Sequence, residues 1–211
     1  MDKWFTVDRI DEDTYIISEY RHWEETHCYL LNGSGRSLLI DTGLGICNIY
    51  DEVVKLTDQL VTAVATHIHW DHIGGHKYFP DFYAHEEELG WLSGGFPLSM
   101  ETVRGMVVDR CELPEGYDVG SYEIFQGRPS VVLRGGEEFA YYPSTDPEAY
   151  LSSLENMALL PVERVFPAHH SLDIQPEIIG RMRDAFQGLK ESGKLRHGSG
   201  TFDYGDWAVW L

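Results

Sequence analysis

The chain contains few basic residues. Lysine and arginine supply 16 of its 211 residues, against 35 aspartates and glutamates, which gives a formal net charge of −19. Because nucleic-acid binding depends on basic contacts to phosphates, this balance argues against a nucleic-acid partner. We interpret the acidity as a solvated surface that favours solubility.

Cysteine is also scarce, and long apolar runs are absent. The three cysteines, Cys28, Cys47 and Cys111, are far apart and form no Cys-x-x-Cys pair. This pattern is typical of reduced thiols in a cytoplasmic protein. No apolar run is long enough to cross a membrane, and the first residues lack the basic and apolar segments of a signal peptide. We therefore expect a cytoplasmic protein with no membrane partner.

Length and patterning predict a single α/β domain over residues 1–211. Hydrophobic residues make up 43% of the chain and charged residues 24%, as in ordinary globular proteins. Short β-branched and aromatic runs predict strands, and apolar residues at helical spacing predict helices. The predicted strands are 4–7, 14–17, 28–31, 37–40, 60–66, 82–84, 162–166 and 201–211. The predicted helices are 46–58, 86–89, one beginning at 145–148, and 176–191, and residues 93–120 are predicted to form a long loop with short helices.

The most informative segment is residues 66–75, THIHWDHIGG. It places His67, His69, Asp71 and His72 within six positions. Imidazole and carboxylate groups are ligands of first-row transition metals. Burying so many of them together without a metal would cost desolvation that nothing offsets. The segment therefore predicts a metal site.

The spacing of these side chains indicates how they could share ions. Residues 60–66 form a short apolar run that is typical of a buried strand. Residues two apart on a strand point to the same side, so His67 and His69 can converge on one ion. Asp71 and His72 then follow in a turn and can bind an adjacent ion, while Gly74 and Gly75 relieve a tight backbone bend.

Three motifs together resemble the metallo-β-lactamase fold superfamily, which includes glyoxalase II-like thioesterases, lactonases, β-lactamases and nucleases. They are HIHWDHIGG over residues 67–75, LLIDTG over 38–43 and VFPAH over 165–169, with alanine where the family usually has glycine. The resemblance implies an αββα sandwich in which Asp71, His72 and His169 bind one metal. It places His67 and His69 on another metal. It also implies that Asp41 supports the metal loop by hydrogen bonding.

The chain departs from the family pattern in its middle. The family supplies a third histidine to the first metal and an aspartate that bridges both metals. Here no histidine lies between His85 and His169, and residues 133–136 lead almost directly into 142–147. Four alternatives follow for the metal site of His67 and His69. Other residues complete it, with His170 the first candidate, or a second chain completes it. Otherwise it binds its metal weakly or is empty. The missing segment would shorten the second sheet and expose an edge, so we expect a homodimer.

The resemblance implies metal-assisted hydrolysis of a small-molecule substrate by one or two Zn²⁺ ions, with iron or manganese as alternatives. Water bound to zinc loses a proton near neutral pH. The resulting hydroxide would attack an ester, thioester, lactone or β-lactam carbonyl while the metal stabilises the oxyanion. Asp71, as a ligand that orients the nucleophile, is the expected catalytic residue.

Two other hypotheses stay open. The chain could be a metal-binding homologue with impaired catalysis, because two expected ligands are missing. It could also be a non-haem iron oxygenase that uses His69, Asp71 and His169 as a set of two histidines and one carboxylate. That hypothesis leaves His67 and His72 without a role.

Overall fold

The computed structural model describes residues 3–134 and 145–211. They form two compact units: one contains the chain up to Arg134 together with Pro167–Leu172, and the other contains the rest. The single domain predicted over residues 1–211 stays a prediction. Within the described ranges, no helix combines the length and apolarity needed to cross a membrane.

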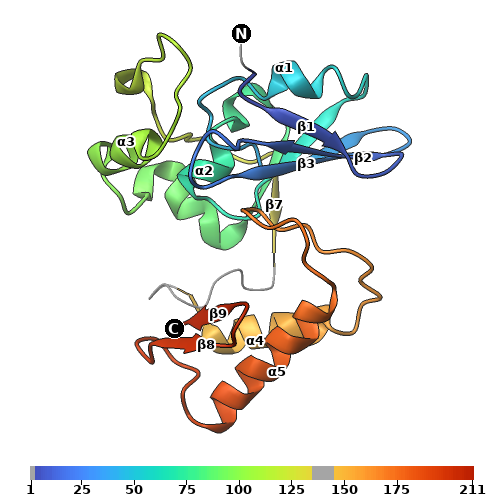
Figure 1. Cartoon of the computed structure of the whole chain (residues 1–211), viewed down its shortest axis with the longest axis vertical. Coiled ribbons are helices and arrows are strands. Elements are labelled where there is room, and N and C mark those ends of the chain that lie inside the picture. Colours follow the sequence, from blue (N-terminus) through green and yellow to red (C-terminus); the bar gives the residue numbers. More distant parts are fainter. Residues whose placement is uncertain (1–2, 135–144) are drawn as a thin grey trace. The chain divides into compact units, whose positions relative to one another are not determined.

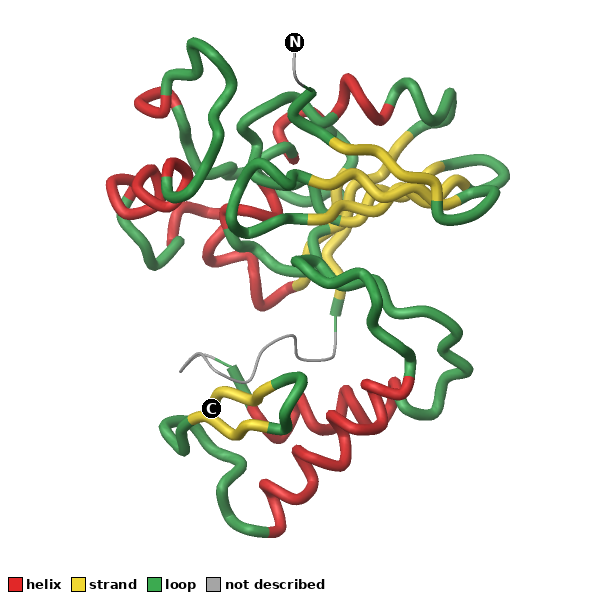
Figure 2. The backbone as a smooth tube through the Cα atoms, in the orientation of Figure 1, coloured by secondary structure: helices red, strands yellow, loops and turns green. Residues whose placement is uncertain are grey.

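The first unit is built on a mixed seven-stranded sheet whose strands follow one another in chain order (Figures 1 and 2). Strands β1 to β4 pair antiparallel, and β4 to β7 pair parallel. This mixed sheet with its helices confirms the predicted α/β class, whereas the four layers of the sandwich stay a prediction. The strands are β1 (Thr6–Arg9), β2 (Thr14–Ser18), β3 (His27–Asn32), β4 (Ser37–Ile40), β5 (Val61–Val64), β6 (Phe82–His85) and β7 (Val131–Leu133).

Helices in this unit are short. They are α1 (Tyr50–Val53), α2 (Trp70–Ile73) and α3 (Met100–Val108), with single helical turns at His76–Tyr78, Glu86–Glu88, Trp91–Gly95 and Val119–Ser121. The helix predicted over 46–58 is therefore reduced to one turn. The side chain of Asn48 accepts a hydrogen bond from the backbone N–H of Tyr50, which delays the helix start. Ile49 and Val53 are buried as the pattern predicts, but Tyr50 is 42% exposed.

The second unit contains α4 (Pro147–Met157), α5 (Glu177–Glu191) and the hairpin β8 (Thr201–Asp203) and β9 (Ala208–Trp210). Leu151 and Leu154 of α4 pack with Phe186 of α5 and Val209 of the hairpin. Helix α4 starts from Asp146, whose carboxylate accepts hydrogen bonds from the backbone N–H groups of Glu148 and Ala149, within the start predicted at 145–148.

Two predicted strands of the second half are wrong. The tail 201–211 forms a hairpin because Gly205, at φ +96°, reverses the chain between β8 and β9. Residues 162–166 form no strand. Their apolar residues line a groove with α4 and α5 instead, since a β-prone run becomes a strand only beside a free sheet edge.

The parallel half of the sheet determines where the candidate site lies. Ile40 of β4 pairs with Val64 of β5 in the parallel register, so the residues that follow both strands emerge at one edge. In open sheets of this kind, ligands bind beyond the carboxyl ends of parallel strands. Asp41 follows β4 and the histidine segment follows β5, which brings motifs 25 or more residues apart in sequence to the same place.

Candidate metal centre

Asp71 and His72 reach the site from the short helix α2. The predicted turn at this position is helical instead, and both residues are at most 5% exposed. The loop after β4 fixes this helix: Thr42 N–H donates to the carbonyl of His72 at 2.7 Å, and Gly74 N–H donates to the carbonyl of Gly43 at 2.9 Å.

Close backbone packing explains the glycines better than a tight bend does. Gly74 has ordinary right-handed helical φ and ψ, so the predicted reason for it is wrong. A Cβ on Gly74 would lie 2.3 Å from the carbonyl oxygen of Leu44, and a Cβ on Gly45 would lie 2.5 Å from Gly74. The absence of side chains lets the loop after β4 lie directly on α2.

His169 arrives from a distant part of the chain through contacts with β3. Thr26 and His169 form an isolated antiparallel bridge, and His27 N–H donates to the carbonyl of Ala168 at 2.8 Å. The hydroxyl of Tyr29 donates to the carbonyl of Pro167 at 2.6 Å. A short peptide held by β3, rather than the predicted strand, therefore presents this histidine.

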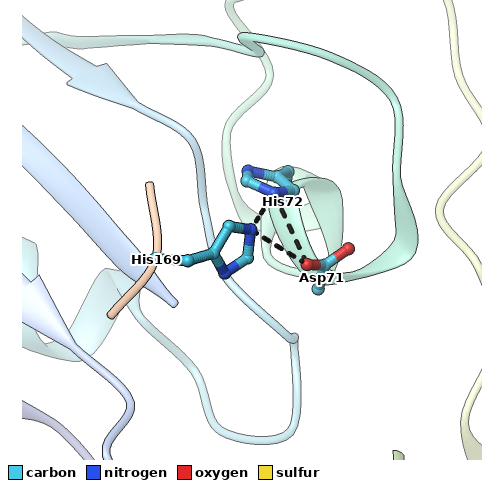
Figure 3. A group of neighbouring side chains, drawn as sticks. All are labelled: Asp71, His72 and His169. Atoms are coloured by element: carbon cyan, nitrogen blue, oxygen red, sulfur yellow. Dashed lines mark hydrogen bonds and ion pairs between the residues drawn. The ribbon is translucent and has the colours of Figure 1, made fainter. Parts of the chain in front are cut away.

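Asp71, His72 and His169 converge in the structure (Figure 3). The Nε2 atoms of the two histidines are 2.9 Å apart, and Asp71 Oδ2 lies 3.4 Å from His72 Nε2 and 3.5 Å from His169 Nε2. Zinc bonds of about 2.0–2.2 Å separate tetrahedral ligands by about 3.4 Å. The three ligand atoms therefore have separations that suit one metal ion.

Hydrogen bonds behind the two histidines fix their tautomers. His72 Nδ1 donates to Asp41 Oδ2 at 2.8 Å, and His169 Nδ1 donates to the carbonyl of Glu24 at 2.9 Å. Since both acceptors are oxygens, the Nε2 atoms of the neutral rings carry lone pairs that face each other across 2.9 Å. Such an arrangement is repulsive unless a cation lies between the rings. The donor set therefore fits a metal ion, and Asp41 has the supporting role implied by the resemblance.

Burial and neighbouring charges shift the pKa values of the two histidines. It lowers the pKa of His169, and the neighbouring His72 lowers it further. Burial opposes protonation of His72 too, but the charges of Asp71 and Asp41 outweigh it and raise the pKa of that imidazole. In the metal-free protein a proton on His72 can thus occupy the position of the cation, and metal binding would release it.

His67 and His69 converge as predicted, although they lie in a loop after β5 and not on the strand. His67 Nε2 is 3.1 Å from His69 Nδ1, and the rings of His67 and His72 have centroids 3.9 Å apart. Burial lowers the pKa of both His67 and His69. The pair lies beside the three-ligand group without joining it within the described ranges, so its own metal stays a prediction.

Other predicted positions have different outcomes. His170 pairs with Glu25 at 3.5 Å and is outside the described ligand group. Of the oxygenase set, Asp71 and His169 come together with His72 in place of His69. The junction of 133–136 with 142–147 falls largely outside the described residues. Homodimer formation is untested and stays a prediction.

Sequence reasoning missed two acidic residues near the centre. Glu24 lies in the loop before β3, where burial and the charge of Asp71 raise its pKa to about 7. Glu19 is fully buried under the loop after β4 and accepts hydrogen bonds from Trp4 Nε1 at 2.7 Å and Leu44 N at 2.8 Å. No motif marks either residue, because only the fold brings them to the histidines.

Burial raises the pKa of Glu19 to about 7, which makes stability depend on pH. Between the ordinary value of about 4.5 and 7, the unfolded chain has lost the proton that the folded chain retains. The folded state therefore becomes less stable as pH rises. Relative to Glu19→Gln, we expect wild-type, metal-free protein to lose about 2 kcal/mol of unfolding free energy from pH 5 to pH 8.

Urea unfolding in the presence of a chelator measures this difference. Glu12→Gln is the control, because Glu12 is exposed. A constant difference between wild type and Glu19→Gln across this pH range would contradict the assigned proton.

An α/β sheet with histidine and carboxylate ligands beyond its parallel strand ends defines a metal-site protein of the α/β class. Residues 22–97 match the model of the metallo-β-lactamase superfamily. This match confirms the resemblance to the superfamily that the motifs indicated.

Comparisons with known proteins agree with this resemblance. The chain is 30% identical over 148 residues to the acyl-coenzyme A thioesterase MBLAC2 of Gallus gallus and 26% identical over 152 residues to that of Homo sapiens. Each alignment covers 64% of this chain and 53% of the relative, so the chain spans about half the length of these relatives.

Solved structures show the same fold at low identity. The DIM-1 metallo-β-lactamase aligns with a TM-score of 0.60 and 10% identity, covering 89% of this chain and 98% of the enzyme. A metallo-β-lactamase superfamily protein from Sulfolobus tokodaii aligns with a TM-score of 0.53 and 16% identity, covering 83% and 86%.

Proposed function

We propose that the chain is a metal-dependent hydrolase of acyl thioesters. The observation that carries the proposal is the convergence of Asp71, His72 and His169, with both Nδ1 atoms hydrogen-bonded away from the centre. Three protein ligands are typical of catalytic rather than structural zinc sites. The thioester class is supported by the acyl-coenzyme A thioesterases among the relatives.

The chain's own residues prepare the site for this chemistry. Asp41 and the Glu24 carbonyl orient the two imidazoles, and burial keeps His169 neutral, so its Nε2 lone pair stays available. Asp71 contributes a negative charge that favours a cation. When bound, a zinc ion would acidify water and polarise the thioester carbonyl.

Metal removal tests the proposal. We expect purified protein to hydrolyse a simple acyl thioester without added oxygen or 2-oxoacid. Dipicolinate should reduce the rate at least about 100-fold, and added Zn²⁺ should restore it, because without the metal nothing at the site acidifies a water molecule to hydroxide. A disulfide reagent that changes colour when it reacts with free thiols measures thioester hydrolysis. Elemental mass spectrometry measures the bound metal.

The outcomes separate the three hypotheses. Bound metal with no thiol release would support the impaired homologue. Bound iron, with turnover that requires oxygen and a 2-oxoacid, would support the oxygenase instead. A rate insensitive to the chelator would contradict metal-dependent hydrolysis.

A further inference from the structure

A cavity in the first unit lies next to His69, because two of its lining residues pack on that histidine. Its volume is about 650 Å³, within the range of roughly 300–1,000 Å³ typical of small-molecule sites. Trp91 and Phe96 line it. The indole of Trp91 stacks on His69 with ring centroids 5.9 Å apart and 13° between the planes, and Phe96 packs edge-on against both rings.

Both apolar and polar side chains line the cavity, and one of the apolar ones, Leu98, is exposed. Five apolar side chains that line it are half-buried, namely Trp91, Phe96, Met100, Ile124 and Phe125. The polar side chains that line it are all exposed, namely Lys77, Ser121, Glu123 and Gln126. The half-buried aromatic and aliphatic side chains can contact a hydrocarbon chain, while the exposed polar side chains can contact water or a polar group.

Charge further limits the class of ligand that this cavity can hold. Lys77 is the single cation among the lining residues, and Glu123 offsets it. The chain as a whole carries a formal net charge of −19. A multiply anionic group, such as the phosphates of a nucleotide, would be repelled here, whereas an uncharged chain would not.

We propose that this cavity holds the acyl chain of the substrate, a linear hydrocarbon of medium length. The inference rests on the proposed thioester hydrolysis. The carbonyl end lies on the histidine side of Trp91, and the chain extends past the Trp91 and Phe96 edges into the cavity. The charged part of the substrate then stays outside it.

Chain-length selectivity tests the proposal. Acetyl and decanoyl thioesters of N-acetylcysteamine carry no phosphate, so they differ only in the chain. Each buried methylene favours binding about fourfold, so we expect kcat/KM for decanoyl to exceed that for acetyl at least about 20-fold. Leu98→Asp and Leu98→Trp, which charge or fill the cavity, should each reduce this ratio about tenfold.

Leu98 is a suitable position because it lines the cavity, is 40% exposed and lies outside the hydrophobic core. The matched control is Leu159→Asp, at a leucine that is 83% exposed in the second unit. This control should leave the ratio unchanged. If wild type and both Leu98 variants have the same ratio of decanoyl to acetyl kcat/KM, the acyl-chain site is overturned. Thioester hydrolysis would not be affected by that result.

A binding measurement separates the site from catalysis. The decanoyl compound with a methylene in place of the thioester sulfur cannot be hydrolysed, and calorimetry measures its affinity. Binding that weakens about tenfold in both Leu98 variants supports the site even if no thioester is cleaved, in which case only the proposed function fails. No binding to wild type overturns the site.

Discussion

Replacing His72 by alanine is expected to lower hydrolysis at least about 100-fold and to remove metal from the protein. His72 Nε2 is one of the three converging ligand atoms, and its ring is fully buried, so no solvent-exposed side chain can take its place. Elemental mass spectrometry gives metal per chain, and thiol release gives the rate.

His169→Ala extends this test with less disturbance of the core, because the His169 side chain is 28% exposed. We expect the His169→Ala variant also to bind less metal per chain. His197→Ala is the control, since His197 is exposed in the second unit. Unchanged metal content in both ligand variants would show that these atoms do not hold the ion.

Replacing Asp41 by asparagine is expected to weaken metal binding about 10–100-fold without removing a ligand. Asp41 accepts hydrogen bonds from Thr66 N, Thr66 Oγ1 and His72 Nδ1. An amide has one accepting oxygen, so its NH₂ group must face at least one of these donors. His72 loses its anionic partner in either orientation of the amide, and in one of them it also loses its hydrogen-bond acceptor.

The same change should destabilise the metal-free fold by about 1–3 kcal/mol, because a buried donor loses its acceptor. Competition with a fluorescent zinc chelator measures affinity, and urea unfolding measures stability. Asp58→Asn, at an exposed aspartate, is the control. Wild-type zinc affinity in Asp41→Asn would show that Asp41 supports the loop but does not tune the metal.

Local sequence patterns predicted the secondary structure well where a short segment carries its own hydrophobic period. Strand β4 occupies the predicted residues, and β3 and β6 differ from their predictions by one or two residues at most. The helix predicted over 176–191 was confirmed within one residue as α5. These elements carry their own hydrophobic period, so few distant contacts are needed to specify them.

Predictions failed where a neighbour decides the structure. Residues 131–133 become β7 because the edge of β6 offers hydrogen bonds. Residues 162–166 have strand composition but line a groove with two helices. Strand propensity reflects packing beside a partner, and that partner is distant in sequence.

The sequence by itself indicated the family resemblance, the ligand types and the order of the motifs, because a metal site needs specific side chains at specific spacings. Only the tertiary structure decided which ligands meet. It grouped Asp71 and His72 with His169, 97 residues away from His72, and placed the Glu24 carbonyl behind His169. These contacts join the loop before β3, helix α2 and a peptide bridged to β3, and no local pattern encodes a distance between such segments.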